Sequence, residues 1–197
     1  MHYVTRIETP LGRLVAASDG VAVVGLWFEG QTHFGATLDE ARERADDLPV
    51  FEDLRRWLNT YFEGRDPGPH PACSPKGTPF RLAVWRELAK VPYGSTVTYG
   101  ELGRRVAHEL GRDSWSARAV GGAVGHNPIS ILLPCHRVVG ADGSLTGYAG
   151  GVETKAALLA LEGVDVGGLR LPRGSALPAS TPSTAPTPSM APAHRGL

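Results

Sequence analysis

The sequence predicts an α+β protein in which a small antiparallel sheet comes first and a mainly helical half follows. Three observations carry this prediction. Residues 3–28 consist of short apolar segments separated by turn residues, which is typical of strands. The apolar residues of 51–63 and 80–90 recur at helical spacing. A stretch rich in proline and glycine, residues 66–76, separates the two halves as a linker.

The first half is predicted to be a domain over residues 1–75. It begins as an antiparallel meander, because Pro10-Leu11-Gly12 and Asp19-Gly20 are turn sequences. The expected strands cover residues 3–9, 13–18 and 21–28. A helix follows at 51–63 and ends at Gly64; its apolar face is Leu54, Trp57, Leu58, Tyr61 and Phe62.

The second half is predicted to be a domain over residues 76–170. Thr78 can cap a helix over 80–90, with Pro79 at the first helical position. Thr98 and Glu101 have the spacing of a capping box and predict a second helix.

A third helix of this half is expected after Gly111, with Ser114 or Ser116 as its cap. The second and third helices around a glycine-containing turn indicate a helix-turn-helix. Asp142-Gly143 predicts a hairpin, and residues 153–162 a last helix.

Composition narrows the class of protein. No apolar run approaches the length of a membrane span, and the first residues lack the layout of a signal peptide, so we expect a cytoplasmic protein. Residues 1–75 hold 7 basic and 12 acidic side chains, whereas residues 76–162 hold 10 and 7, so a polyanion would meet the second half first. Residues 171–197 consist mainly of Pro, Ser, Thr and Ala and are expected to be a disordered tail.

Cys135 is the candidate nucleophile, although a free cysteine is most often a small buried hydrophobe. His136 and Arg137 follow it, and a neighbouring base or cation lowers the pKa of a thiol. Adjacent side chains of an extended segment point to opposite faces, so a Cys–His contact would need a bridging water or a local kink. With only two cysteines and no His or Cys at ligand spacing, neither a disulfide framework nor a metal site is expected.

The segment Pro134-Cys135-His136-Arg137-Val138 resembles the active-site segment of the O6-alkylguanine-DNA alkyltransferases, also called methylated-DNA–protein-cysteine methyltransferases. The resemblance covers residues 78–163 well and the first half in outline. It implies a ribonuclease H-like first domain and a winged-helix-like second domain that carries the helix-turn-helix. The other motifs that stand in the family's order are Tyr99-Gly100-Glu101-Leu102, Ala117-Arg118-Ala119-Val120-Gly121, Asn127-Pro128, Gly147-Tyr148-Ala149-Gly150-Gly151 and Leu158-Leu159-Ala160-Leu161-Glu162.

The resemblance implies direct-reversal DNA repair. An alkyl group passes irreversibly from O6-alkylguanine in duplex DNA to Cys135, once per protein molecule and without a cofactor. O4-alkylthymine is left open as a second substrate. His136 would act as a base through a water molecule, Glu162 would orient it, and Asn127 would tie the surrounding turn. Tyr148 would donate to the leaving base.

The resemblance also implies the contacts with DNA. Arg118 would fill the place of the flipped nucleotide, and Tyr99 would crowd the 3′ phosphate. Arg137 is included among the DNA contacts, and the carbonyls of Cys135 and Val138, with Ala149 and Gly150, would hold the base. A small-residue helix surface would approach the minor groove of double-stranded DNA without reading its sequence; it consists of Ser116, Ala117, Ala119, Gly121 and Gly122. A monomer is expected, with cooperative binding left open.

Three alternatives remain at this point. A non-catalytic lesion-binding protein of similar fold would lack the cysteine; a regulator using the helix-turn-helix would need a cysteine-rich zinc domain; and Cys135 could be buried and inert.

Two features depart from the family pattern. The stretch 107–113 lengthens the turn before Arg118 and offers Arg112 as an extra phosphate contact, and Trp115 either packs inward or touches DNA.

Overall fold

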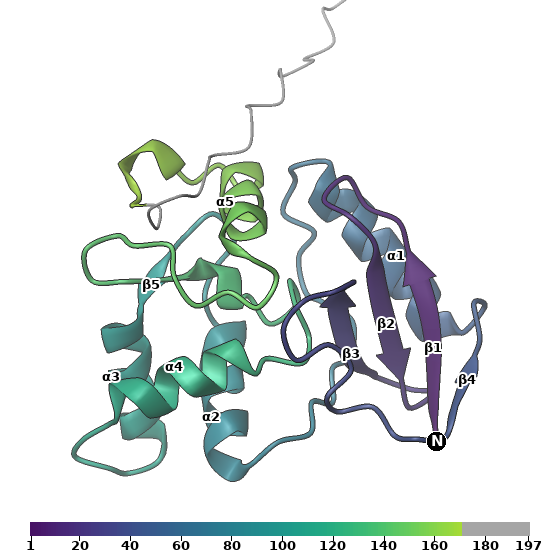
Figure 1. The fold of residues 1–197 in the computed structure, drawn as a ribbon, viewed down its shortest axis with the longest axis horizontal. Helices are drawn as coiled ribbons and strands as arrows, with labels where there is room; N and C mark the ends of the chain where they lie inside the picture. Colours follow the sequence, from purple (N-terminus) through teal and green to yellow (C-terminus); the bar gives the residue numbers. More distant parts are fainter. Residues whose placement is uncertain (171–197) are drawn as a thin grey trace, which may run out of the picture.

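The computed structural model describes residues 1–170, so the predicted tail at 171–197 lies outside the described residues. A sheet covered by helix α1 forms one side of the molecule, and the helices α2 to α5 lie on the other side (Figure 1). This arrangement confirms the α+β fold class. No helix within residues 1–170 is both long and apolar enough to cross a membrane.

The first half is a four-stranded sheet of order β3-β2-β1-β4. Strands β1 (His2–Ile7), β2 (Leu14–Ser18) and β3 (Val23–Phe28) form the predicted antiparallel meander. Strand β4 (Arg42–Arg44) pairs with β1 in parallel and was not predicted, because its three charged residues show no apolar alternation. Helix α1 (Pro49–Phe62) matches the predicted helix within two residues.

The second half follows the predicted order of helices. In α2 (Pro79–Ala89), the Thr78 hydroxyl accepts the Arg81 N–H; in α3 (Tyr99–Glu109), Thr98 and Glu101 form the predicted capping box; and Ser116 caps α4 (Ala117–Gly125). The remaining elements are β5 (Val97–Thr98), the 3-10 helix η1 (Cys135–Arg137), β6 (Val138–Val139), α5 (Val152–Leu161) and the 3-10 helix η2 (Val166–Gly168).

One local prediction, the hairpin at Asp142-Gly143, was wrong. Asp142-Gly143 forms a tight turn, but no strand follows it within the described residues: Ser144 makes a single bridge with Arg170, and β6 pairs in parallel with β5. Cys135 does not lie in an extended segment, because η1 bends the chain there. The local kink that a Cys–His arrangement would need is therefore present.

One apolar cluster joins the two halves. It includes Phe51 and Leu54 of α1, Leu26 of β3, and Trp85 and Leu102 of the helical half, all of them essentially inaccessible to solvent. Because each half buries its apolar face against the other, they form one rigid support for the residues at their boundary.

Candidate active site and DNA-binding surface

Cys135 is held in a tight loop by Asn127. The Asn127 side-chain amide donates to the Leu133 carbonyl at 2.6 Å and lies 3.0 Å from the Cys135 sulfur, and its oxygen accepts the Ile129 N–H at 3.0 Å. Ile131, inside this loop, has φ of 69°, a strained value for a β-branched residue that the surrounding contacts must enforce. Asn127 thus lies where it can fix the loop and the thiol together.

The first half of the chain supports this loop directly. The Leu26 N–H of β3 donates to the Pro128 carbonyl at 2.9 Å, and the Ser130 N–H donates to the Leu26 carbonyl at 2.8 Å. The loop that leads to Cys135 is therefore hydrogen-bonded to the edge strand of the sheet. The position of the thiol depends on both halves.

The thiol of Cys135 is buried, and burial raises its pKa. The hydrogen bond from Asn127 and the positive charge of Lys155 act in the opposite direction but do not overcome burial. Since the thiolate is the reactive form, this cysteine needs a base to take its proton.

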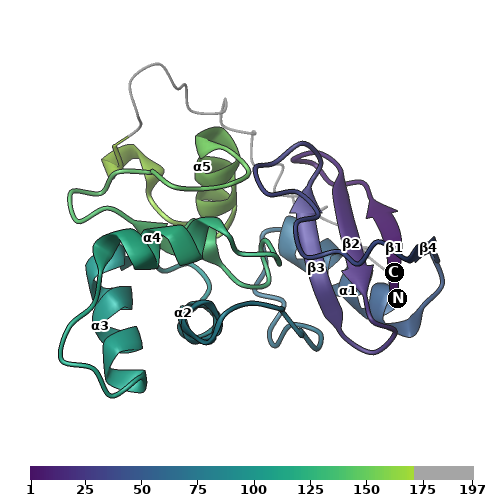
Figure 2. The same ribbon diagram turned by 60° about the horizontal axis from the view of Figure 1, so that its bottom comes forward.

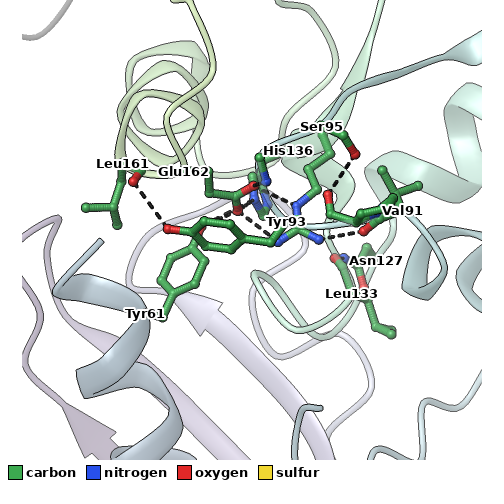
Figure 3. Close-up of polar contacts among 12 residues, drawn as sticks. Tyr61, Val91, Tyr93, Ser95, Asn127, Leu133, His136, Leu161 and Glu162 are labelled. Carbon is green, nitrogen blue, oxygen red and sulfur yellow. Dashed lines mark hydrogen bonds and ion pairs between the residues drawn. The ribbon is translucent and has the colours of Figure 1, made fainter. Parts of the chain in front are cut away.

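His136 and Glu162 form the centre of a buried polar cluster (Figure 3). His136 Nε2 lies 2.7 Å from Glu162 Oε1, and the Tyr61 hydroxyl donates to the same oxygen at 2.7 Å. Glu162 Oε2 accepts from Arg137 Nε at 2.8 Å and from the Gly94 N–H at 3.1 Å. The carboxylate is thus surrounded by donors, as a buried anion requires.

The pKa shifts of His136 and Glu162 indicate which atoms of the two side chains carry protons. Burial opposes the charged form of Glu162, but hydrogen bonds from His136 and Arg137 outweigh it and lower the pKa of the carboxyl to about 2. Burial lowers the pKa of His136, although Glu162 partly restores it. A neutral imidazole facing a carboxylate carries its proton on Nε2, which leaves Nδ1 as the basic nitrogen. Within residues 1–170, this buried Nδ1 has no hydrogen-bond partner.

Arg137 requires a correction. It was expected to contact DNA, but it is only 8% exposed, and its guanidinium donates to Glu162 and to the Val91 carbonyl at 2.6 Å. A guanidinium used in this way cannot reach a phosphate. The motif alone could not reveal this, because its partner carboxylate lies 25 residues away in sequence.

Lys155 is a site residue that the sequence analysis missed. Its side chain is fully buried, and its ammonium donates to the Val138 carbonyl and to the Thr146 carbonyl, the latter at 2.8 Å. The sequence does contain an indication of its burial, since Lys155 occupies the apolar face that Val152, Ala156 and Leu159 define in the last helix. Tyr61 was also missed, because its spacing places it in an apolar stripe of α1 and its partner Glu162 is distant in sequence.

Tyr148 and the carbonyls expected to hold the base lie next to this cluster. The Tyr148 hydroxyl is buried without a partner in the described residues, and its ring centre is 6.4 Å from that of His136. The Cys135 carbonyl accepts the Val138 N–H, and the Val138 carbonyl accepts from Lys155. The exocyclic amine of a bound guanine would therefore share each of these two carbonyl oxygens with a donor of the protein.

The chain around Tyr148 is shaped by glycine and by the first half. A Cβ at Gly150 would come within 2.7 Å of the Tyr148 ring, so glycine here makes room for the tyrosine itself. The Ala149 carbonyl accepts the Thr32 N–H at 3.1 Å. Tyr99 donates its hydroxyl to the Thr146 carbonyl at 3.1 Å and covers Gly147.

Helix α4 presents an exposed surface of small residues beside this site. Apart from the adjoining backbone of α4 itself, a Cβ on Gly121 or Gly122 would have no atom within 4 Å, so no packing contact in the described chain explains these two helix-destabilising glycines. Arg118 projects from the same helix without an ion pair in residues 1–170. The exposed residues on the first two turns of α4 and its cap are Ser116, Ala117, Arg118, Ala119 and Gly122.

Trp115 packs against α3. A Cβ on Gly103 would lie only 2.4 Å from its indole, and one on Gly100 would lie 4.0 Å away. Of the two placements left open for this residue, the structure thus shows the indole seated in a notch of α3. Glycine at position 103 creates that notch.

The comparisons with known proteins agree in both halves. Residues 79–164 match the family described as 6-O-methylguanine DNA methyltransferase, DNA binding domain, and residues 2–67 match its ribonuclease-like domain. The Methylated-DNA--protein-cysteine methyltransferase of Haemophilus influenzae is 40% identical over 161 residues, which cover 81% of this chain and 86% of that protein. The protein of that name from Mycobacterium tuberculosis is 41% identical over 163 residues, covering 82% and 92%.

A solved structure extends the likeness to three dimensions. The crystal structure of Mycobacterium tuberculosis OGT in complex with DNA is similar with a TM-score of 0.69 and 39% identity, over 81% of this chain and 92% of that one. The fold and site define a class of two-domain proteins with a buried cysteine beside a helix-turn-helix. Within that class, the chain belongs to the methylated-DNA–protein-cysteine methyltransferase family.

Proposed function

We propose that this protein repairs duplex DNA by transferring the alkyl group of O6-alkylguanine to the sulfur of Cys135. The observation that carries the proposal is that the buried Cys135 adjoins the His136–Glu162 pair and contacts Asn127, two residues after the end of α4 with its exposed small-residue surface. Family membership supports the activity. The cysteine itself argues against a lesion-binding protein without chemistry.

The reaction begins with activation of the thiol. His136 Nδ1 takes the proton of Cys135 through a water molecule, while Nε2–H stays bound to Glu162, which stabilises the imidazolium that forms. The sulfur then attacks the alkyl carbon, a C–S bond forms, and the bond from that carbon to O6 breaks. The electron pair leaves with the guanine.

The leaving guanine needs donors for its developing negative charge. The Tyr148 hydroxyl is available because it is buried without a partner in residues 1–170, and burial raises its pKa, which keeps its proton in place. The Ala149 N–H is a second donor to O6. The carbonyls of Cys135 and Val138 position the base through its exocyclic amine.

The product fixes the stoichiometry. A thioether is not hydrolysed under mild conditions, so each molecule acts once and needs no cofactor. The alkyl carbon of a paired guanine is inside the duplex, so the nucleotide flips out, at a cost of about a few kcal/mol. Arg118 takes its place in the stack, and Tyr99 crowds the adjoining phosphate.

The small-residue surface of α4 is suited to the minor groove, where a helix must come close and little sequence information is available. Residues 76–170 carry this contact and the chemistry, and residues 1–75 hold the active-site loop in place. The protein acts as a monomer in the cytoplasm at the nucleoid, and cooperative binding along DNA and transfer from O4-alkylthymine are extensions of the same proposal.

Gly122→Ala tests the role of the α4 surface. Because a Cβ there meets no atom of the protein, alanine is expected to stabilise the fold by up to about 1 kcal/mol through helix propensity. The same methyl group is expected to weaken binding of duplex DNA several-fold. Urea unfolding and fluorescence anisotropy with a labelled duplex measure the two effects. Unchanged DNA affinity in the stabilised variant would remove α4 from the interface.

The function itself is tested by mass spectrometry. The protein is incubated with a duplex that contains O6-methylguanine, digested, and the peptide with Cys135 is weighed. One added methyl group at Cys135, with none at Cys73 and none in Cys135→Ala, is the expected result. Tight binding of the lesion duplex with an unmodified peptide would instead identify a lesion-binding protein, and no binding would identify an inert cysteine.

A further inference from the structure

Four arginines on the surface of α3 and α4 and the turn between them lack ion-pair partners. The side chains of Arg104, Arg105, Arg112 and Arg118 are exposed, and none makes a hydrogen bond or salt bridge to another residue in the described part of the chain. In residues 1–75, five of the seven guanidinium groups make hydrogen bonds, those of Arg13, Arg44, Arg55, Arg56 and Arg65, whereas Arg6 and Arg42 make none.

Two of the unpaired arginines share a hollow of about 380 Å³. Arg104 enters it from the middle of α3, and Arg112 and Ser114 enter it from the turn before α4. Asp113 is a carboxylate in the same hollow, and it makes no ion pair within residues 1–170. Even with Asp113, the two guanidiniums leave this hollow net positive. His108 and Trp115 complete its wall.

Trp115 gives the hollow a fixed shape. Its indole fills the notch at Gly103 and reaches Gly100, next to Tyr99 at the start of α3. It also lies directly before Ser116, the cap of α4. The turn is therefore anchored between the starts of the two helices assigned to the DNA contact. In Figure 2 it projects on the side away from the sheet of the first half.

We propose that Arg104, Arg112 and the Ser114 hydroxyl bind a backbone phosphate of duplex DNA outside the flipped-nucleotide site. Guanidinium groups match the geometry of phosphate oxygens, and a hydroxyl can donate to a third oxygen. The first helix of a helix-turn-helix crosses the DNA backbone, which is the position of Arg104 on α3. This inference rests on the proposed function, since it takes duplex DNA as the partner.

The salt dependence of DNA binding tests the proposal. Each phosphate that the protein neutralises contributes about 0.9 to the slope of log affinity against log salt concentration. Arg112→Gln keeps a long polar side chain and removes only the charge. We expect it to reduce the slope by up to about 0.9 and to weaken binding several-fold at low salt. Asp113→Asn is expected to strengthen binding at low salt.

Arg42→Gln is the matched control, because Arg42 is also exposed and has no ion pair in the described residues, but it lies on β4 in the first half. The full-length chain is titrated with a duplex containing O6-methylguanine and with an undamaged one. Slopes for Arg112→Gln equal to those for Arg42→Gln would overturn the proposal. Methyl transfer to Cys135 in the unsubstituted chain reports on the chemistry, whereas the salt slopes report on this phosphate contact, so failure of the proposed function and failure of this contact are separate results.

Discussion

Glu162→Gln is expected to slow alkyl transfer to Cys135 by about a hundredfold, within the range that general base catalysis contributes. A neutral amide cannot stabilise the imidazolium of His136 as the carboxylate does. The variant also leaves the buried guanidinium of Arg137 without its counter-charge, which typically costs about 3–5 kcal/mol of stability. Single-turnover kinetics on an O6-methylguanine duplex and urea unfolding measure the two losses.

The pH dependence of stability gives this prediction a direction. The pKa of Glu162 falls from its ordinary value of 4.5 to about 2 on folding. A lowered carboxyl pKa stabilises the folded state above the unfolded value, and this stabilisation, about 3 kcal/mol, is lost as the pH falls from 4.5 through 2. The difference in unfolding free energy between wild type and Glu162→Gln should therefore shrink over that interval. A difference that stays constant with pH would show that the carboxylate is not held ionised by its donors.

Two tyrosine variants serve as graded controls. Tyr61→Phe removes one donor to Glu162 Oε1 and should slow transfer by about tenfold, less than Glu162→Gln does. Tyr93→Phe makes the same chemical change nearby, but its hydroxyl donates to the Leu161 carbonyl and not to Glu162. It should transfer at nearly the wild-type rate. Wild-type rates in both Tyr61→Phe and Glu162→Gln would rule out the assigned relay.

Lys155→Met is expected to slow transfer by roughly tenfold or more at neutral pH. Methionine fits the buried volume but removes the ammonium that joins the Val138 and Thr146 carbonyls and lowers the pKa of the Cys135 thiol. Burial lowers the pKa of Lys155 to about 8, so the wild-type ammonium is present below that pH and is lost as the pH rises through it. The deficit of the variant should therefore be largest below pH 8.

Alkylation of Cys135 by iodoacetamide over a pH series checks this. The thiol of Lys155→Met should react with a higher apparent pKa than the wild-type thiol. Cys73 is an internal control, because its pKa is raised to about 12 by burial alone. Lys155→Arg keeps the charge in a larger group and tests whether charge or fit matters. Superimposable pH profiles for Cys135 in wild type and Lys155→Met would contradict the prediction.

The local features of this fold were predictable because they depend on neighbours in sequence. Thr78 and the Thr98–Glu101 box cap the helices they were expected to cap, and Ser116 is the one of the two candidate caps that is used, since a cap needs only residues one turn away. The family motifs identified Cys135, His136 and Glu162, which the structure brings together. Their roles stay predictions until they are measured.

The remaining features depend on partners far away in sequence. Strand β4 is charged throughout and exists only because β1 offers it an edge. Arg137 was predicted to contact DNA because no residue near it in sequence indicates that it pairs with Glu162. Lys155 and Tyr61 sit on apolar helix faces, and only the packed structure shows which polar groups they reach. Such long-range pairs set the geometry of this site.

The segment between the halves, residues 66–76, affects how the protein unfolds. Its composition is that of a flexible linker, yet the Val23 N–H donates to the Ala72 carbonyl and the Ser74 N–H donates to the Val23 carbonyl, both at 2.8 Å. Together with the shared apolar cluster, this joins the segment to β3, the strand that also holds the loop before Cys135. The two halves should therefore lose structure in one cooperative step. A substitution that unfolds the sheet would therefore also displace the loop that positions Cys135, and alkyl transfer would be lost even though the substitution lies far from the DNA.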